Sequence, residues 1–162
     1  MRHKVTFTPD DRVVQFLKEE LPELNLEGQN LGGPNWFVVA VWNADDQVIA
    51  ALTAEFKTPF DAHISAAIAD PGALSFKLLE VIFSTLFKKA KRITALVDPD
   101  NTESIARLED LGFWYEGFLR RGLDGVRDAK VYGLLPEDCP FLARKARRRR
   151  PAAAGEPLVW IH

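Results

Sequence analysis

Cysteine, methionine and tyrosine are scarce in this sequence of 162 residues, which contains one, one and two of them. The lone cysteine, Cys139, excludes an internal disulfide framework and a cysteine-based zinc cluster. We therefore expect no metal site and a reducing compartment, the cytoplasm. No apolar stretch approaches the roughly 18 residues that span a bilayer, and Arg2 and Lys4 are not followed by the apolar run of a secretion signal. These absences predict a protein that neither enters a membrane nor is exported.

Apolar side chains are plentiful, and charge is unevenly distributed. Hydrophobic residues make up 47% and aromatic residues 10% of the chain, which is enough for a packed core, and the length predicts one domain. Six of the 21 basic residues but one of the 23 acidic residues lie in residues 141–162, which leaves a formal charge of −7 on residues 1–140. An acidic body does not resemble a nucleic-acid groove; it favours a cationic partner.

The basic residues near the end form a block from Arg144 to Arg150. We divide the chain into a folded domain, residues 1–142, and a basic tail, residues 143–162. A block of like charge is most often a solvated arm, and the functional alternative is contact with a nucleic acid or a partner protein. The apolar residues 158–161 are strand-like and can pair with a sheet edge of the same or a neighbouring subunit, so the sequence allows a homodimer.

The periodicity of the apolar residues predicts ten elements. Strands are predicted at about residues 3–8, 36–42, 48–56, 62–69, 93–97, 116–123 and 128–135. Helices are predicted at about residues 9–20, 72–91 and 100–111. The resulting order, β-α-β-β-β-α-β-α-β-β, predicts an α+β fold in which helices cover both faces of a mixed sheet.

Polar residues at the starts of two helices predict their caps. Asp70 followed by Pro71 is typical of an N-cap and a first-turn proline, so we expect the second helix to begin there. Asp100 and Glu103 fit a capping box for the third helix. Gly112 then predicts a left-handed end to that helix.

Residues 101–113 read N-T-E-S-I-A-R-L-E-D-L-G-F. This segment resembles the N-x-x-S-x-x-x-L-E-x-L-G-F signature of the GNAT-superfamily acyltransferases, and the RimJ/RimL-like branch is the most similar. The resemblance extends to Glu116-Gly117 and to residues 128–135, and the element order also matches that of the superfamily. It implies direct transfer of an acetyl group from acetyl-CoA to an amine.

The resemblance also implies where the cofactor lies. The sheet would be splayed, with the pantetheine arm of the cofactor between the strands at 62–69 and 93–97. Ser104 would lie near the leaving thiolate and act on it as a hydrogen-bond or proton donor, because Leu108 stands where many relatives carry an acidic tyrosine. The residues implied in cofactor binding are Ala67, Ala69, Gly72, Ala73, Asn101 and Ser104.

The phosphate-binding loop departs from the pattern of the superfamily, which is Q/R-x-x-G-x-G/A. Residues 69–76 read A-D-P-G-A-L-S-F, with one glycine and no cation before Lys77. If Asp70 caps the helix, its carboxylate occupies the place where the helix would bind a pyrophosphate. This departure predicts weakened CoA binding.

The base that takes the proton from the amine is open among Glu55, Asp61 and His63, each on or beside a predicted strand. Two functions are also open. The first is an acetyl-CoA-dependent N-acyltransferase acting on an amine of a small molecule or a protein N-terminus. The alternative is a catalytically inactive protein of the same fold that binds a nucleic acid or a partner protein through its arginine-rich tail.

Overall fold

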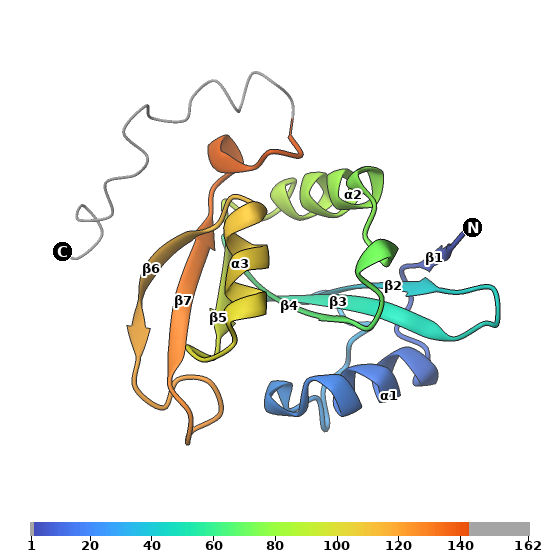
Figure 1. Cartoon of the computed structure of the whole chain (residues 1–162), viewed down its shortest axis with the longest axis horizontal. Helices are drawn as coiled ribbons and strands as arrows, with labels where there is room; N and C mark the ends of the chain where they lie inside the picture. The colour runs from blue at the N-terminus through green and yellow to red at the C-terminus, as the bar shows by residue number, and fades with distance from the viewer. Residues whose placement is uncertain (1, 143–162) are drawn as a thin grey trace.

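The computed structural model describes residues 2–142 (Figure 1). The basic tail predicted at 143–162 lies outside the described residues. The strands are β1 (Lys4–Thr6), β2 (Trp36–Trp42), β3 (Val48–Phe56), β4 (Asp61–Ile68), β5 (Arg92–Val97), β6 (Trp114–Leu119) and β7 (Ala129–Leu134). The helices are α1 (Asp11–Glu20), α2 (Phe76–Phe87) and α3 (Thr102–Asp110), with short 3-10 turns η1 (Pro22–Leu24), η2 (Pro71–Ala73) and η3 (Pro136–Asp138). None of the helices within residues 2–142 combines the length and apolarity needed to cross a membrane.

All seven strands form one sheet in the order β1-β2-β3-β4-β5-β7-β6. Every pairing is antiparallel except that of β4 with β5. The exception follows from the connections, because short turns join β2, β3 and β4, whereas α2 provides the crossover that a parallel pair requires. The mixed sheet confirms the predicted α+β fold and element order.

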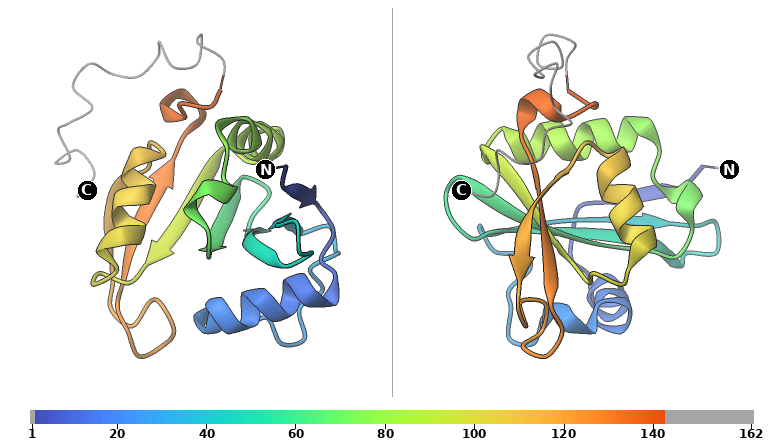
Figure 2. Two further views of the ribbon diagram at one scale, coloured as in Figure 1. Left: turned by 45° about the vertical axis from the view of Figure 1, so that its right-hand side comes forward. Right: turned by 60° about the vertical axis from the view of Figure 1, so that its left-hand side comes forward.

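Alternate residues of the strands supply two separate cores. Val39 and Val41 of β2 lie beneath α2 and α3, together with Phe83 of α2. Val38, one position away, lies in the other core with Leu17 of α1. This alternation is the period of two along a strand, and it places α1 on the opposite face of the sheet from α2 and α3 (Figure 2).

The predicted start of α2 is wrong by several residues. The helix begins after Ser75, whose hydroxyl accepts the N–H of Leu78 at 3.1 Å. Asp70 caps the short turn η2 instead, with its carboxylate accepting the N–H of Gly72 at 2.9 Å. The prediction that the Asp70 carboxylate occupies the start of α2 is therefore wrong, because this carboxylate caps the turn before the helix.

The start of α3 also differs from the prediction by one residue. Asn101 is the N-cap, and its amide oxygen accepts the N–H of Ser104 at 3.1 Å. Glu103 pairs with Arg107 at 2.5 Å and does not complete a capping box. Gly112, with φ +96°, confirms the left-handed end of the helix.

Candidate functional site

β4 and β5 pair over three residues and then part. Asp61, Ala62 and His63 lie opposite Arg92, Ile93 and Thr94. Beyond His63, β4 pairs with β3 alone, while β5 pairs with β7 on its other side. The backbone groups of β4 that face this divergence have no strand partner, so they are available to an extended ligand that carries amides.

A chain of hydrogen-bonded side chains lies where β4 and β5 still pair. Arg92 donates from Nη2 to Glu116 at 2.5 Å and from Nε to the Thr94 hydroxyl at 3.1 Å. Thr94 donates to Oδ1 of Asp61 at 2.7 Å, and Oδ2 of Asp61 lies 3.3 Å from Nε2 of His63. The structure thus brings together two of the three candidate bases, Asp61 and His63.

This chain of side chains lies on the α1 side of the sheet. His63 is opposite Glu55 in the register of β4 with β3, whereas the neighbouring pair, Ala54 and Ile64, belongs to the core beneath α2 and α3. Glu55, the third candidate base, bonds to Nζ of Lys57 at 2.6 Å. Glu55 is therefore already paired with a cation, while His63 is paired with a carboxylate.

Gly133 makes room for the ion pair at one end of the chain. A Cβ at Gly133 would collide with the carboxylate of Glu116 and lie 2.6 Å from Nη2 of Arg92. A side chain at this position of β7 would displace the Glu116 carboxylate and the Arg92 guanidinium from the positions in which they pair. Gly133 lies opposite Thr94 in the register of β5 with β7. β7 therefore lies next to the Thr94 hydroxyl, which is at the centre of the hydrogen-bonded side chains.

Asn101 and Ser104 lie on the other face of the sheet. The neighbouring α3 residues Ile105 and Leu108 pack against the core beneath α2 and α3. Ser104 is half-buried, and its hydroxyl bonds to no residue within 2–142. The structure therefore separates Ser104 from His63 and Glu55 by the thickness of the sheet, with the divergence of β4 and β5 between them.

The turn between β4 and α2 holds most of the other residues expected at the cofactor. The N–H groups of Gly72 and Ala73 are bonded to Asp70, at 2.9 and 3.0 Å. The N–H of Ala69 is bonded to the carbonyl of Ile49 at 2.9 Å. Among the described residues, the N–H groups at the start of α2 that have no partner are those of Phe76 and Lys77.

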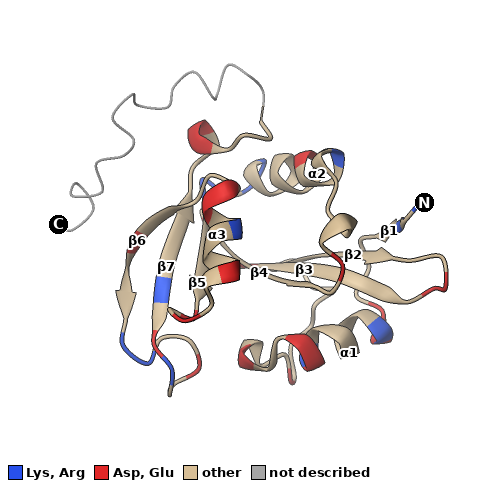
Figure 3. Cartoon of the chain, viewed as in Figure 1, with Lys and Arg blue, Asp and Glu red and all other residues tan. Residues whose placement is uncertain are grey.

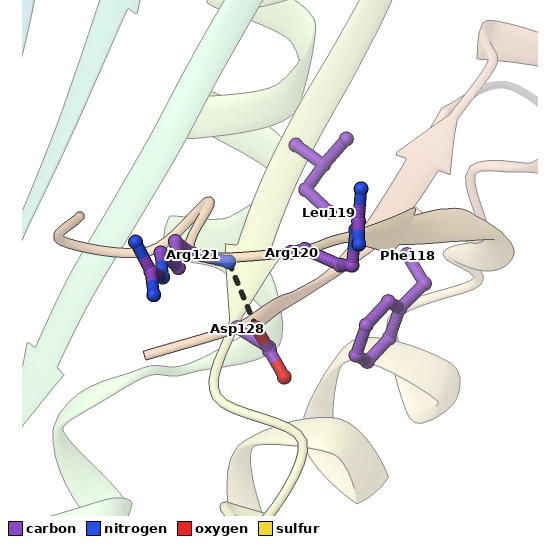
Figure 4. Close-up of a pocket in the computed structure, with 5 residues that line it drawn as sticks. All are labelled: Phe118, Leu119, Arg120, Arg121 and Asp128. Carbon is purple, nitrogen blue, oxygen red and sulfur yellow. Dashed lines mark hydrogen bonds between the residues drawn. The ribbon is translucent and has the colours of Figure 1, made fainter. Parts of the chain in front are cut away.

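The β6–β7 hairpin ends in an open hollow lined by Phe118, Leu119, Arg120, Arg121 and Asp128 (Figure 4). Basic and acidic residues both occur at this end of the hairpin, as they do on α1 and α3 (Figure 3). The Asp128 carboxylate accepts the N–H of Arg121 at 2.8 Å. The hollow includes none of the residues predicted at the site, so it is a separate feature.

Sequence reasoning missed three members of the hydrogen-bonded chain, namely Arg92, Thr94 and Glu116. Arg92 falls between the helix predicted at 72–91 and the strand predicted at 93–97, and it is the first residue of β5. The available signal was the spacing of Arg92 and Thr94, because two polar residues that alternate with buried ones in a strand face the same side. Glu116 was noted only as part of the family resemblance, and no local pattern connects it with Arg92.

No protein-family model and no curated protein matches the sequence. Solved structures of acetyltransferases resemble the fold. A chimera of the Vibrio cholerae spermidine N-acetyltransferase SpeG with hSSAT is 18% identical, with a TM-score of 0.62 over 83% of this chain and 96% of that one. RimJ of Mycobacterium smegmatis, solved with CoA-disulfide, is 28% identical, with a TM-score of 0.54 over 75% of this chain and 61% of that one.

Proposed function

We propose that this chain, which has the fold of the GNAT acetyltransferases, is an N-acyltransferase that transfers an acetyl group from acetyl-CoA to an amine. The observation that carries the proposal is the divergence of β4 from β5 after three residue pairs. Ser104 lies on one face of the sheet beside this divergence, and His63 lies on the other. A donor and an acceptor that approach from opposite faces would meet between the two strands.

The residues along β4 and α3 fit the chemistry of the cofactor. The unpaired edge of β4 offers the peptide groups of Ile64 and Ala66 to a pantetheine arm, itself built from amides. Ala67 alternates with them and stands opposite Ala51, so its own N–H and C=O point to β3, as the N–H of Ala69 does. Asn101 and Ser104 stand at the start of α3, where backbone N–H groups and the helix dipole favour anions. Acetyl-CoA supplies an activated acyl group as a thioester.

The pyrophosphate would be bound at the start of α2. The N–H groups of Phe76 and Lys77 have no partner among the described residues and suit an anion. Gly72 and Ala73 would add two more donors once Asp70 releases them. The Asp70 carboxylate would remain beside the phosphates, and its charge would weaken their binding.

His63 is the base that the geometry supports best. Histidine changes its charge near neutral pH as a residue type, and Nδ1 of His63 bonds to no residue within 2–142. Glu55 is bonded to Lys57, which competes for the carboxylate. His63 would take the proton of the acceptor ammonium, and the Ser104 hydroxyl would donate a hydrogen bond to the leaving sulfur.

The acceptor that we propose is a cationic amine, on a small molecule or a protein N-terminus. The formal charge of −7 on residues 1–140 attracts cations, and one structural neighbour is named a spermidine N-acetyltransferase. The likeness to RimJ supports placement in the RimJ/RimL-like branch. The single cysteine is the basis for placing the reaction in the cytoplasm.

Thermal unfolding with and without excess acetyl-CoA tests the proposal, with CoA and desulfo-CoA as matched ligands. A ligand at 100 times its dissociation constant stabilises the folded state by about 2.7 kcal/mol. A clear upward shift of the midpoint would justify a screen of amine acceptors. No shift at millimolar ligand would refute the proposal and favour the inactive alternative, in which the tail at 143–162 binds a nucleic acid or a partner.

A further inference from the structure

We propose that Asp61, Thr94 and Arg92 are positioning residues that hold His63 in the tautomer with its proton on Nε2. Nδ1 is then the ring atom that accepts the proton of the amine. The tautomer follows from contacts within the folded chain, and its use in catalysis rests on the proposed function.

The directions of the hydrogen bonds are forced from Arg92 onward. A guanidinium only donates, so the Thr94 oxygen accepts the Nε–H of Arg92 at 3.1 Å. The hydroxyl has a single proton, and its other partner is Oδ1 of Asp61 at 2.7 Å. Thr94 is 5% exposed, which keeps water from competing for that proton. Thr94 therefore donates to Asp61.

Asp61 determines the direction of the hydrogen bond to His63. Both oxygens of a carboxylate are acceptors. Because Oδ1 is occupied by Thr94, Oδ2 is the oxygen that faces the imidazole, at 3.3 Å from Nε2. Nε2 must donate to it, which leaves the lone pair on Nδ1. The His63 side chain is 32% exposed, so Nδ1 is within reach of a ligand.

Neighbouring charges leave Asp61 as the partner of His63. Glu55 lies opposite His63 on β3, and its carboxylate is bonded to Lys57 at 2.6 Å. Of the lysines and arginines that the structure describes, Arg92 is the one within 4 Å of Asp61, with Nε 3.6 Å from Oδ1.

Arg92, at the end of the hydrogen-bonded series farthest from His63, is held in place by its neighbours. Glu116 bonds to Arg92, and the absence of a side chain at Gly133 leaves space for both groups. Arg92 is therefore held by an ion pair on one side and by Thr94 on the other, which fixes the guanidinium where its Nε–H meets the hydroxyl.

The test reads the tautomer of neutral His63 from the ¹⁵N and ¹³C NMR signals of its ring in the ligand-free protein, assigned with His63→Asn. Asp61→Asn is the decisive variant. Thr94 still donates to the amide oxygen, so the amide NH₂ faces the ring and Nε2 must accept. We expect the proton to move to Nδ1, as happens when an aspartate that orients a histidine is changed to asparagine.

A second substitution in the Asp61→Asn background isolates the role of Thr94. Thr94→Val removes the hydroxyl, so the amide is free to turn its oxygen to His63 and the inversion should be lost. Thr53→Val is the matched control. Thr53 is 1% exposed and lies on the same face of the sheet, and its hydroxyl has no hydrogen-bond partner within residues 2–142. The inversion should persist in that control.

An unchanged tautomer in Asp61→Asn would overturn the role of Asp61, and an inversion that survives Thr94→Val would overturn that of Thr94. Backbone amide spectra show whether each variant is folded. If Asp61→Asn does not fold, the two threonine variants are compared with Asp61 intact. Thr94→Val must then shift the NMR signals of the His63 ring, and Thr53→Val must leave them unchanged.

The tautomer and the proposed function can fail separately. The NMR experiment uses protein without ligand, whereas acetyl-CoA binding is measured by thermal unfolding. An inverted tautomer without acetyl-CoA binding would uphold the positioning role and refute the enzyme. Acetyl-CoA binding without inversion of the tautomer would support the proposed enzyme and refute the positioning role.

Discussion

Replacing Gly112 by alanine should strongly destabilise the fold, because the new methyl group would meet backbone. Gly112 has φ +96°, and an added Cβ would lie 2.6 Å from the carbonyl oxygen of Asp138 and 3.1 Å from Cδ of Pro140. The left-handed conformation costs an alanine about 1–2 kcal/mol. Overpacking adds about 1–3 kcal/mol, since the carbonyl cannot rotate away as a flexible side chain can. The sum is a large share of a typical stability of about 5–15 kcal/mol.

Gly125→Ala is the matched control for this substitution. Gly125 has φ +88°, and an added Cβ would meet nothing within 4 Å. It should therefore lose only the conformational cost of about 1–2 kcal/mol. Urea denaturation of both variants gives the two losses, and their difference measures the collision with Asp138. Equal losses would refute the reasoning, because they would mean that the segment after β7 moves away without cost.

Three further predictions concern charge and cofactor contacts. Hydrogen bonds from Arg127 and Val126 lower the pKa of Asp124 from 3.8 to about 2. This carboxylate therefore stabilises the fold above pH 3.8, and its contribution is lost as the pH falls to about 2. The stability of Asp124→Asn should fall less steeply than that of the unmodified protein between these two pH values. Identical acid-unfolding curves for the two proteins would contradict this prediction. Asn101→Ala should cost about 1 kcal/mol of stability through the lost cap and should weaken acetyl-CoA binding. Asn101→Asp should keep the cap and still weaken binding. If both variants bind acetyl-CoA as the unmodified protein does, Asn101 is not part of the cofactor site. Asp70→Asn should strengthen acetyl-CoA binding by about 1 kcal/mol, the interaction of two unit charges about 4 Å apart in water. Titration calorimetry that shows no gain would exclude repulsion by Asp70.

Local patterns predicted the strands well and one helix start poorly. The bounds of β2 and β3, residues 36–42 and 48–56, are as predicted, because a polar turn separates two apolar runs. Two caps compete at the start of α2, Asp70 and Ser75. Asp70 belongs to the end of the sheet, since its N–H bonds to the carbonyl of Ile49 at 3.1 Å. That bond depends on how β3 and β4 end together, which propensity at a single position does not encode.

The site was predictable only as far as it is local. Asp61 and His63 are two residues apart in one strand, so their shared face follows from the period of a strand. Thr94 joins them because β5 lies between β4 and β7, a pairing that no short pattern specifies. Glu116 depends in addition on an irregularity of β6, whose register with β7 shifts between Tyr115 and Gly117.

The short pairing of β4 with β5 has a mechanical consequence. Three residue pairs join the part of the sheet formed by β1–β4 to the part formed by β5–β7, and the hydrogen bond from Thr94 to Asp61 crosses at that place. A small rotation of one part against the other would change the spacing of the diverging strand ends far more than that of the paired residues. Opening of the two parts as separate units would be visible by hydrogen exchange, as lower protection at Ala62 and Ile93 than in the interior of either part. The side chains of Asp61 and Thr94, which orient His63, would then also hold the two parts of the sheet together.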